Sequence, residues 1–342
     1  QWPVSLFGEY SYNARTMALG NAASLPNGFA AGLRNPAQIT ETEGVCFYLN
    51  GTVNLNRENR SFPVFSFFDS YIDDATYMVS EHAYTDAQFG WALQKTFGNF
   101  VLQQSFGYLP AQNGDYTYQE DVRNDGDTNN NGDVMRIGFN ELLRDGGVDA
   151  YSLGLAAHYQ TGNVWLPQVG LGLGLNFLQA DLTEARKITF TEEALAIAPS
   201  AENVDQSFNF SDDALQMRIG AHAYVGERLQ LSAGFSPSYS FEQEDLLMID
   251  STQTISQTTT FDCPSKWLVG AIFQPRSHLN TTAVLEMEFI NGEDFAQSIS
   301  DADTSFTAVS GENVVAFRAG IEHIFPNKIP MRLGFRYQPS FY

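Results

Sequence analysis

Apolar residues recur at every second position over long stretches of this chain, and this alternation constrains the fold more than any other feature. From Val169 to Phe177, large apolar side chains alternate with glycine or asparagine. A period of two gives a β-strand two different faces, whereas an amphipathic helix would show a period near 3.6. The pattern recurs in seven further segments, at 47–54, 151–158, 215–223, 229–235, 283–289, 315–322 and 331–337. We therefore predict an all-β fold.

The connections between these segments alternate in length. Short turns such as Gly98-Asn99 join some of them, and long polar segments join the others. Outer-membrane barrels show this pattern, with short periplasmic turns and long extracellular loops. We predict a transmembrane antiparallel β-barrel over 44–342, with 11–13 countable strands and long loops at 112–148, 182–212, 244–263 and 291–312. A soluble barrel with an apolar core is the alternative.

Charged residues on the alternating segments lie on the face opposite the large apolar residues. A charge that faces the lipid midplane costs about 2–4 kcal/mol, so in a membrane barrel these side chains point into the lumen. The predicted luminal charge network contains both signs and consists of Arg218, Glu286, Glu288, Arg318, Glu322, Arg332 and Arg336.

Composition excludes several classes of protein. The 342 residues include 18 Lys+Arg and 40 Asp+Glu, a formal net charge of −22, which argues against a nucleic acid as partner. No stretch of about 18 apolar residues is present, so a transmembrane helix is not expected. The two cysteines, Cys46 and Cys263, allow either one disulfide or two free thiols.

No motif of a known catalytic class is present, and we predict that the protein is not an enzyme. The run 170–174 has G-x-G-x-G spacing inside a strand with no helix after it, which does not fit a dinucleotide-binding site. The five histidines are scattered singly, so a histidine-rich metal site is not expected. His158 and His222 share the luminal face with Ser152 and Ser232, and a hydrolytic barrel is therefore a remote alternative.

The sharpest local motif is an oxygen-rich run at 125–133. It resembles calcium-binding loops, because calcium prefers six to eight oxygen ligands. The candidate ligands are Asp125, Asp127, Asn129, Asn131 and Asp133. The run departs from an EF-hand because Arg136 occupies the position of that motif's glutamate. Asp, Asn and Gly are also common in turns, so a polar loop without metal is the alternative.

Two segments do not alternate. Residues 1–43 are rich in Ala, Gly, Asn and Pro, and we predict that they form a luminal hatch, with a periplasmic tail as the alternative. Arg15 and Arg34 are available to pair with luminal glutamates. In the second segment, we predict that Thr191 is the N-cap of a short helix over 192–197. The candidate ligand-binding residues of the hatch are Met17, Leu19, Leu25, Phe29, Asn35 and Pro36.

The order of several motifs resembles one family of membrane barrels. The stretch from Asn13 to Ala22, followed by Asn35-Pro36-Ala37, is similar to the opening of the FadL-type outer-membrane transport proteins and their PorV-like relatives. Looser matches follow at 147–154, 264–270 and 331–337. The resemblance implies a barrel of about 14 strands with an N-terminal luminal hatch, in the outer membrane of a Gram-negative bacterium. It also implies that the chain continues beyond Tyr342.

The resemblance implies two functions. FadL-type members take up fatty acids and other hydrophobic compounds, whereas PorV-like members anchor or shuttle a secretion or cell-surface partner. We expect passive uptake of a fatty-acid-like solute, with membrane lipid and a hydrophobic small molecule as partners and no cofactor apart from calcium. A non-transporting anchor for a surface or secretion protein is the alternative. A continuous apolar path from the loops to the hatch favours transport, and a sealed polar lumen favours the anchor.

Overall fold

The computed structural model describes residues 13–40, 42–66, 68–123, 136–197, 203–250, 253–275, 280–300 and 305–340. Most of these residues are β-strand, as the alternation predicts. The described helices are short: α1 (Ala14–Ala18), the 3-10 helix η2 (Gly28–Leu33), α2 (Glu192–Ile197) and the 3-10 helix η3 (Gly292–Asp294). None of them has the length and apolar character that a membrane crossing requires.

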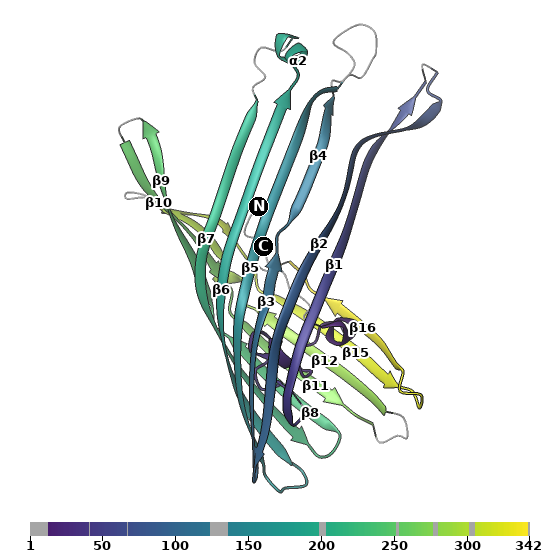
Figure 1. Cartoon of the computed structure of the whole chain (residues 1–342), viewed down its shortest axis with the longest axis vertical. Helices are drawn as coiled ribbons and strands as arrows, with labels where there is room; N and C mark the ends of the chain where they lie inside the picture. Colours follow the sequence, from purple (N-terminus) through teal and green to yellow (C-terminus); the bar gives the residue numbers. More distant parts are fainter. Residues whose placement is uncertain are drawn as a thin grey trace.

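One large antiparallel sheet forms the body of the molecule (Figure 1). Its strands are β1 (Gly44–Phe65), β2 (Tyr71–Phe97), β3 (Phe100–Asn113), β4 (Tyr116–Arg123), β5 (Arg136–Gln160), β6 (Gln168–Phe190), β7 (Val204–Val225), β8 (Leu229–Ser236), β11 (Lys266–Phe273), β12 (Asn280–Ile290), β15 (Val314–Ile324) and β16 (Pro330–Tyr337). They pair in the order β1-β2-β3-β5-β6-β7-β8-β11-β12-β15-β16, with β4 added to β5. The eight segments with alternating residues all lie in these strands, which confirms that part of the prediction.

A second sheet continues four strands of the first. It consists of β9 (Tyr239–Asp250), β10 (Gln253–Cys263), β13 (Ala296–Ser300) and β14 (Ser305–Ser310), in the order β14-β13-β10-β9. Pro237 separates β9 from β8, and Pro264 separates β10 from β11. Proline has no N–H to donate to a sheet ladder, so the strands change sheets at these points.

The predicted long loops are therefore largely strand. The 112–148 segment contains β4 and the first half of β5, and the 244–263 and 291–312 segments contain parts of hairpins. The 182–212 segment holds the ends of β6 and β7 and the predicted helix α2, whose start is confirmed because Thr191 Oγ1 accepts a hydrogen bond from the Ala194 N–H at 3.2 Å. Polar residues occur on both faces of these extensions, so no regular apolar alternation marks them as strands.

The region near residue 70 is a single long hairpin. β1 pairs with β2 from Gly44↔Gln94 to Phe65↔Tyr71. The segments 61–68 and 71–79 hold the far ends of these two strands and no additional strand. The hairpin tip lies at the end of the sheet opposite the short turns (Figure 1).

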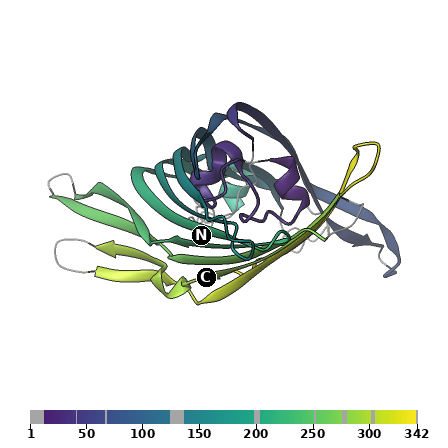
Figure 2. The same cartoon turned by 90° about the horizontal axis from the view of Figure 1, so that it is seen from below.

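The large sheet curves into a trough, and the N-terminal segment lies on its concave side (Figure 2). Burial alternates along the strands. In β5, Ser152 and Ala156 are buried on the concave face, whereas Tyr151 and Leu155 are exposed on the convex face. A soluble barrel would bury its large apolar residues, so this distribution contradicts that alternative and agrees with a convex face in lipid.

Aromatic residues form two rows on the convex face. Ring centroids in the upper row are separated by 5.4, 5.4 and 6.4 Å along Phe89, Tyr108, Tyr151 and Phe177. The lower row stands eight residues away along β2, β3 and β5, at Phe97, Phe100 and Tyr159. Eight residues span about 26 Å along a strand. A strand tilt of about 35–45° reduces this spacing to about 20 Å, somewhat less than the apolar band of about 25 Å between the aromatic girdles of a membrane barrel.

Candidate functional site

The hatch, defined here as residues 13–40, lies against the concave face of the large sheet (Figure 2). The helix η2 contacts β2, β3, β5 and β6, and α1 contacts β16. From Leu19 to Thr40 every hatch residue except Pro26 is buried. The hatch is thus packed against the wall along most of its length.

Glycines on the concave face form a seat for the hatch. A Cβ atom at Gly172 would lie 2.3 Å from the carbonyl carbon of Pro36, and one at Gly174 would lie 2.2 Å from the carbonyl oxygen of Gly32. Such distances leave no space for a side chain, so close contact requires glycine at both positions. The run 170–174 is therefore a contact surface for the hatch. The other glycines that face hatch atoms are Gly90, Gly107, Gly154, Gly220, Gly270, Gly320 and Gly334.

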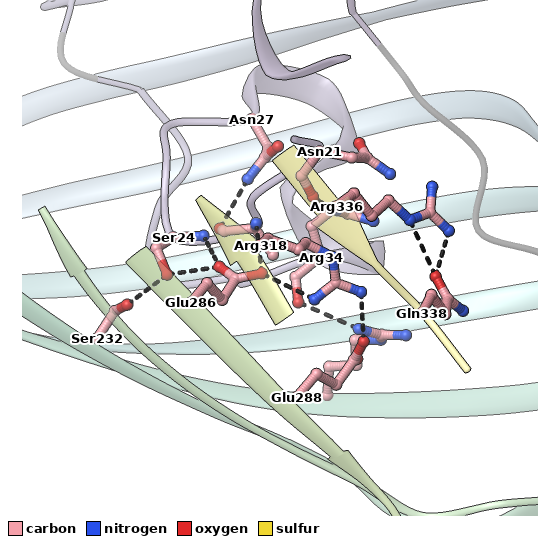
Figure 3. Close-up of polar contacts among 12 residues, drawn as sticks. Asn21, Ser24, Asn27, Arg34, Ser232, Glu286, Glu288, Arg318, Arg336 and Gln338 are labelled. Carbon is pink, nitrogen blue, oxygen red and sulfur yellow. Dashed lines mark hydrogen bonds and ion pairs between the residues drawn. The ribbon is translucent and has the colours of Figure 1, made fainter. Parts of the chain in front are cut away.

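A buried carboxylate holds the hatch from the opposite wall (Figure 3). Glu286 of β12, which is 1% exposed, accepts hydrogen bonds from the Ala23 N–H at 3.1 Å, the Ser24 N–H at 2.7 Å and the Ser24 hydroxyl at 2.6 Å. Arg318 of β15 donates to Glu286 at 3.0 Å and to Glu288 at 2.6 Å. We call these contacts of Glu286 and Arg318 the Glu286 latch. Its charges are buried together, so removal of Glu286 leaves Arg318 with Glu288 as its one remaining ion-pair partner among the described residues.

A second ion pair and several wall side chains also bind the hatch. Arg15 forms an ion pair with Glu322 at 2.7 Å, and Arg332 pairs with the same carboxylate at 2.6 Å. Wall side chains reach four backbone carbonyls of the hatch: Gln103 to Thr40 at 2.5 Å, Asn176 to Gly32 at 3.0 Å, Arg218 to Arg34 at 3.2 Å and His222 to Ala37 at 3.0 Å. These bonds satisfy carbonyls that burial removes from water.

An apolar cluster covers the concave face between the hatch and the long-hairpin end. Its floor is Phe29, Ala30 and Leu33 of the hatch. Its wall consists of Leu109, Val148, Ala150, Leu178, Ala180, Leu182, Phe210, Ala214, Phe241, Phe261, Cys263, Ile290 and Phe295. On the short-turn side of the hatch the concave face is instead polar, with Gln94, Gln103, Gln168 and Gln230. The apolar surface thus leads from the long-hairpin end to the hatch and stops there.

Positive charges surround the point where the apolar cluster meets the hatch. The ammonium group of Lys266 interacts electrostatically with Glu288, Arg218 and Arg34. It has no hydrogen bond or ion pair within the described part of the chain. The cationic cluster is defined as Arg34, Arg218, Lys266, Arg318 and Arg336, which face the two carboxylates Glu286 and Glu288. The local excess of positive charge contrasts with the net charge of −22 of the chain.

The structure separates the predicted ligand-binding residues of the hatch. Met17 is 68% exposed on α1. Leu19 and Leu25 form a small buried group with Ile272 and Val284 of the wall. None of the three belongs to the apolar cluster, and their role in ligand binding stays a prediction. They were chosen for their apolar character, and the sequence of an irregular segment does not show which side chains face the wall.

The remaining three candidates also differ in role. The Asn35 side chain accepts a hydrogen bond from the Ala37 N–H at 3.1 Å, and Pro36 is seated on Gly172. Both therefore hold the shape and position of the hatch. Phe29 alone among the six belongs to the apolar cluster, where its ring lies 5.4 Å from that of Tyr48.

The seven residues of the predicted luminal charge network all occupy positions on the concave face of the sheet. Arg336, on the edge strand β16, donates to Gln338 at 3.0 Å (Figure 3).

The candidate calcium ligands at 125–133 lie outside the described residues. Within the described ranges, no group of three or more His, Cys, Asp or Glu side chains is arranged to hold a metal ion.

The two cysteines should react very differently with a thiol reagent. Both are free, but Cys263 is buried in the apolar cluster above the upper aromatic row, and burial raises the pKa of its thiol to about 12. The thiolate is the reactive form, so Cys263 needs a pH near that value. At pH 8 we expect a maleimide to label half-buried Cys46 alone in the folded protein. Peptide mass spectrometry of the wild type, Cys46→Ser and Cys263→Ser checks this, and labelling of Cys263 would contradict its burial.

Comparisons with known proteins show the fold. No protein-family model and no curated protein matches the chain. Among solved structures, a Pseudomonas aeruginosa FadL homologue matches with a TM-score of 0.58 and 11% identity, over 98% of this chain and 82% of that one. The toluene transporters TbuX of Ralstonia pickettii and TodX of Pseudomonas putida match with TM-scores of 0.57 and 0.55, each at 13% identity. The alignments cover 96% and 97% of this chain and 86% and 85% of theirs. The chain therefore has the fold of FadL-type barrels, as its motifs predicted.

Proposed function

We propose that this chain is a passive channel for hydrophobic compounds in the outer membrane of a Gram-negative bacterium. The observation that carries the proposal is the apolar cluster, which leads from the long-hairpin end to Phe29 of the hatch. The two aromatic rows on an apolar convex face support a position in a bilayer. The solved structures with this fold include toluene transporters and a monoaromatic hydrocarbon channel.

Entry of a solute follows from the hydrophobic effect. A hydrophobic molecule that leaves water for the apolar cluster gains about 25 cal/mol per Å² of apolar surface removed from water. The hatch blocks the path below the cluster, because glycines seat it and Glu286 holds it. Passage therefore requires a shift of the hatch, which thermal motion and the bound solute supply without an energy source.

The cationic cluster favours a solute with an acidic head group. A carboxylate that reaches the base of the apolar cluster meets the ammonium of Lys266, and charge-assisted hydrogen bonds of this kind are among the strong ones. The apolar tail would then occupy the cluster above. We therefore propose fatty-acid-like solutes, in preference to the toluene of the named transporters.

Replacement of Lys266 by methionine tests the substrate class. Methionine keeps an apolar stem and removes the charge, so we expect affinity for a long-chain fatty acid to fall at least about tenfold, because a hydrogen bond to a charged group contributes about 1.5–3 kcal/mol. Affinity for a neutral alkane of the same length should not change. Isothermal titration of the purified barrel in detergent measures both. Lys95→Met, at an exposed residue of β2, is the matched control. Equal affinity of the variant and the wild type for the acid would refute the acidic head group.

The tight seat of the hatch favours a second candidate function, a non-transporting barrel that anchors a surface or secretion protein. The glycine seat leaves no space for a side chain between Gly174 and Gly32. A barrel that binds neither acid nor alkane would support the anchor. Calcium at 125–133 remains a proposal that rests on the oxygen-rich sequence alone.

A further inference from the structure

Below the hatch, toward the short turns, the concave face encloses a polar pocket of about 360 Å³. Residues 37–40 of the hatch form one side of it, and side chains of β2, β3, β5, β6, β7 and β8 form the others. Its described lining contains two histidines, five wall glutamines and no charged side chain. The pocket lies on the opposite side of the hatch from the apolar cluster, so it plays no part in the capture of solute proposed above.

The two histidines meet across a glycine. His158 of β5 and His222 of β7 are both cross-strand partners of Gly170 on β6. Their ring centroids are 4.4 Å apart, with the ring planes at 85°. A Cβ atom at Gly170 would lie 2.6 Å from an atom of each ring. Glycine at this position therefore allows two imidazoles from non-adjacent strands to come into contact.

Each imidazole uses one nitrogen and leaves the other without a partner. His222 Nδ1 bonds to the Ala37 carbonyl oxygen at 3.0 Å, and His158 Nδ1 lies 3.2 Å from the side-chain amide nitrogen of Gln168. The side chains are only 5–6% exposed, and both Nε2 atoms are buried with no hydrogen-bond partner among the described residues. His222 can donate Nδ1–H to the carbonyl oxygen and then carries a lone pair on Nε2. A half-turn of the Gln168 amide exchanges its nitrogen and oxygen, and His158 then has the same tautomer. Histidines that bind metals are oriented in this way.

Further unsatisfied atoms lie in the same pocket. Gln103 Oε1 and Gln38 Nε2 are also buried and without a partner within the described ranges, and both residues line the pocket. Buried polar groups in proteins are nearly always satisfied, so these four atoms indicate an occupant of the pocket. The two imidazole nitrogens and Gln103 Oε1 can bind a metal ion, and the Gln38 amide N–H can donate to a water bound to it. Amide oxygens and water can complete a coordination shell that two imidazoles begin.

The chemical groups that line the pocket favour some metal ions over others. The pocket offers neutral imidazole and amide groups and no carboxylate, which disfavours calcium and magnesium. Imidazole suits copper, nickel and zinc, and copper(II) binds most tightly in the general affinity order of divalent ions. We propose that His158 and His222 form a two-histidine site for a divalent transition metal directly below the hatch. Because His222 also holds the Ala37 carbonyl, an occupied site stabilises the seated hatch.

Copper(II) binding to the full chain, folded in detergent, tests the site. We expect one tightly bound equivalent, with an electron paramagnetic resonance spectrum that shows coupling to two imidazole nitrogens. His158→Gln and His222→Gln should each weaken binding at least tenfold. His82→Gln and His323→Gln, at histidines outside the pocket, are the matched controls and should bind as the wild type does.

The electron paramagnetic resonance spectrum of the wild-type protein tests the proposal even if a variant does not fold. A spectrum with fewer than two coordinated nitrogens, or the absence of a stoichiometric copper ion, would overturn the proposal. Full binding by both folded His158→Gln and His222→Gln would overturn it as well. Failure of the barrel to bind any hydrophobic solute would not affect this result, because the copper titration requires no transport.

Discussion

Replacement of Glu286 by alanine should release the hatch and destabilise its seated position by about 3–5 kcal/mol, the usual effect of breaking a buried ion pair. The substitution removes the acceptor of the Ala23 and Ser24 N–H groups and deprives Arg318 of one of its two carboxylates. We expect lower resistance to urea in lipid vesicles. Conductance in planar bilayers should rise because the hatch no longer closes the path.

An exposed ion pair of the same protein supplies the control for this prediction. Glu81 pairs with Arg57 at 2.8 Å on the long hairpin, with the two side chains 58% and 70% exposed. Exposed pairs contribute about 0–1 kcal/mol, so Glu81→Ala should leave urea resistance and conductance nearly unchanged. If both variants behaved like the wild type, the Glu286 latch would have no role in holding the hatch.

Replacement of Gly174 by valine should displace the hatch by steric force alone. The first added carbon would already lie 2.2 Å from the Gly32 carbonyl oxygen, and overpacking of this kind costs about 1–3 kcal/mol or more. The hatch should then become sensitive to protease, and conductance should rise as it does in Glu286→Ala. Limited proteolysis with mass spectrometry locates the cuts within residues 13–40.

Ala221→Val is the matched control. Ala221 is on the neighbouring strand β7, on the opposite face of the sheet from Gly174, and faces away from the hatch. This variant should keep both protease resistance and closed-state conductance. Equal protease sensitivity of the two variants would show that valine disturbs the strands in general. Full resistance of Gly174→Val would contradict the glycine seat.

The sequence predicts strands well wherever the two faces of the sheet meet different environments. Along β5 and β6, the convex side carries apolar residues, as expected for the proposed contact with lipid, and the concave side carries small or polar residues that face the hatch. Beyond the upper aromatic row this contrast disappears. The far ends of β1, β2, β9 and β10 therefore resemble polar loops in sequence, although they are paired strands.

The site was partly predictable for the same reason. Strand parity alone placed Glu286, Arg318 and Glu322 on the concave face, and the pairing of Arg15 with a luminal glutamate followed from charge. Of the six hatch residues chosen, only Phe29 belongs to the apolar cluster, because an irregular segment has no period that shows which side chains face it. The alternate glycines at 170–174 were a usable signal: glycine on the inward face of a strand leaves space for another backbone.

The contact between the two histidines depends on the register of the strands as well as on the face of the sheet that each residue occupies. Both His158 and His222 were assigned to the luminal face, but they belong to strands that are separated by β6. Their contact depends on the pairing of each with Gly170, and no sequence pattern defines that register. Only the folded sheet brings two scattered histidines to one pocket.

Uptake of a hydrophobic solute is the most direct test of the central claim. The full chain is expressed in a Gram-negative host that lacks its own channel for such solutes, and entry of a radiolabelled long-chain fatty acid is measured over time. The account predicts saturable uptake well above that of cells with an empty vector, and faster uptake by cells that carry Glu286→Ala. Uptake no higher than the vector control, with the folded barrel present in the outer membrane, would contradict it.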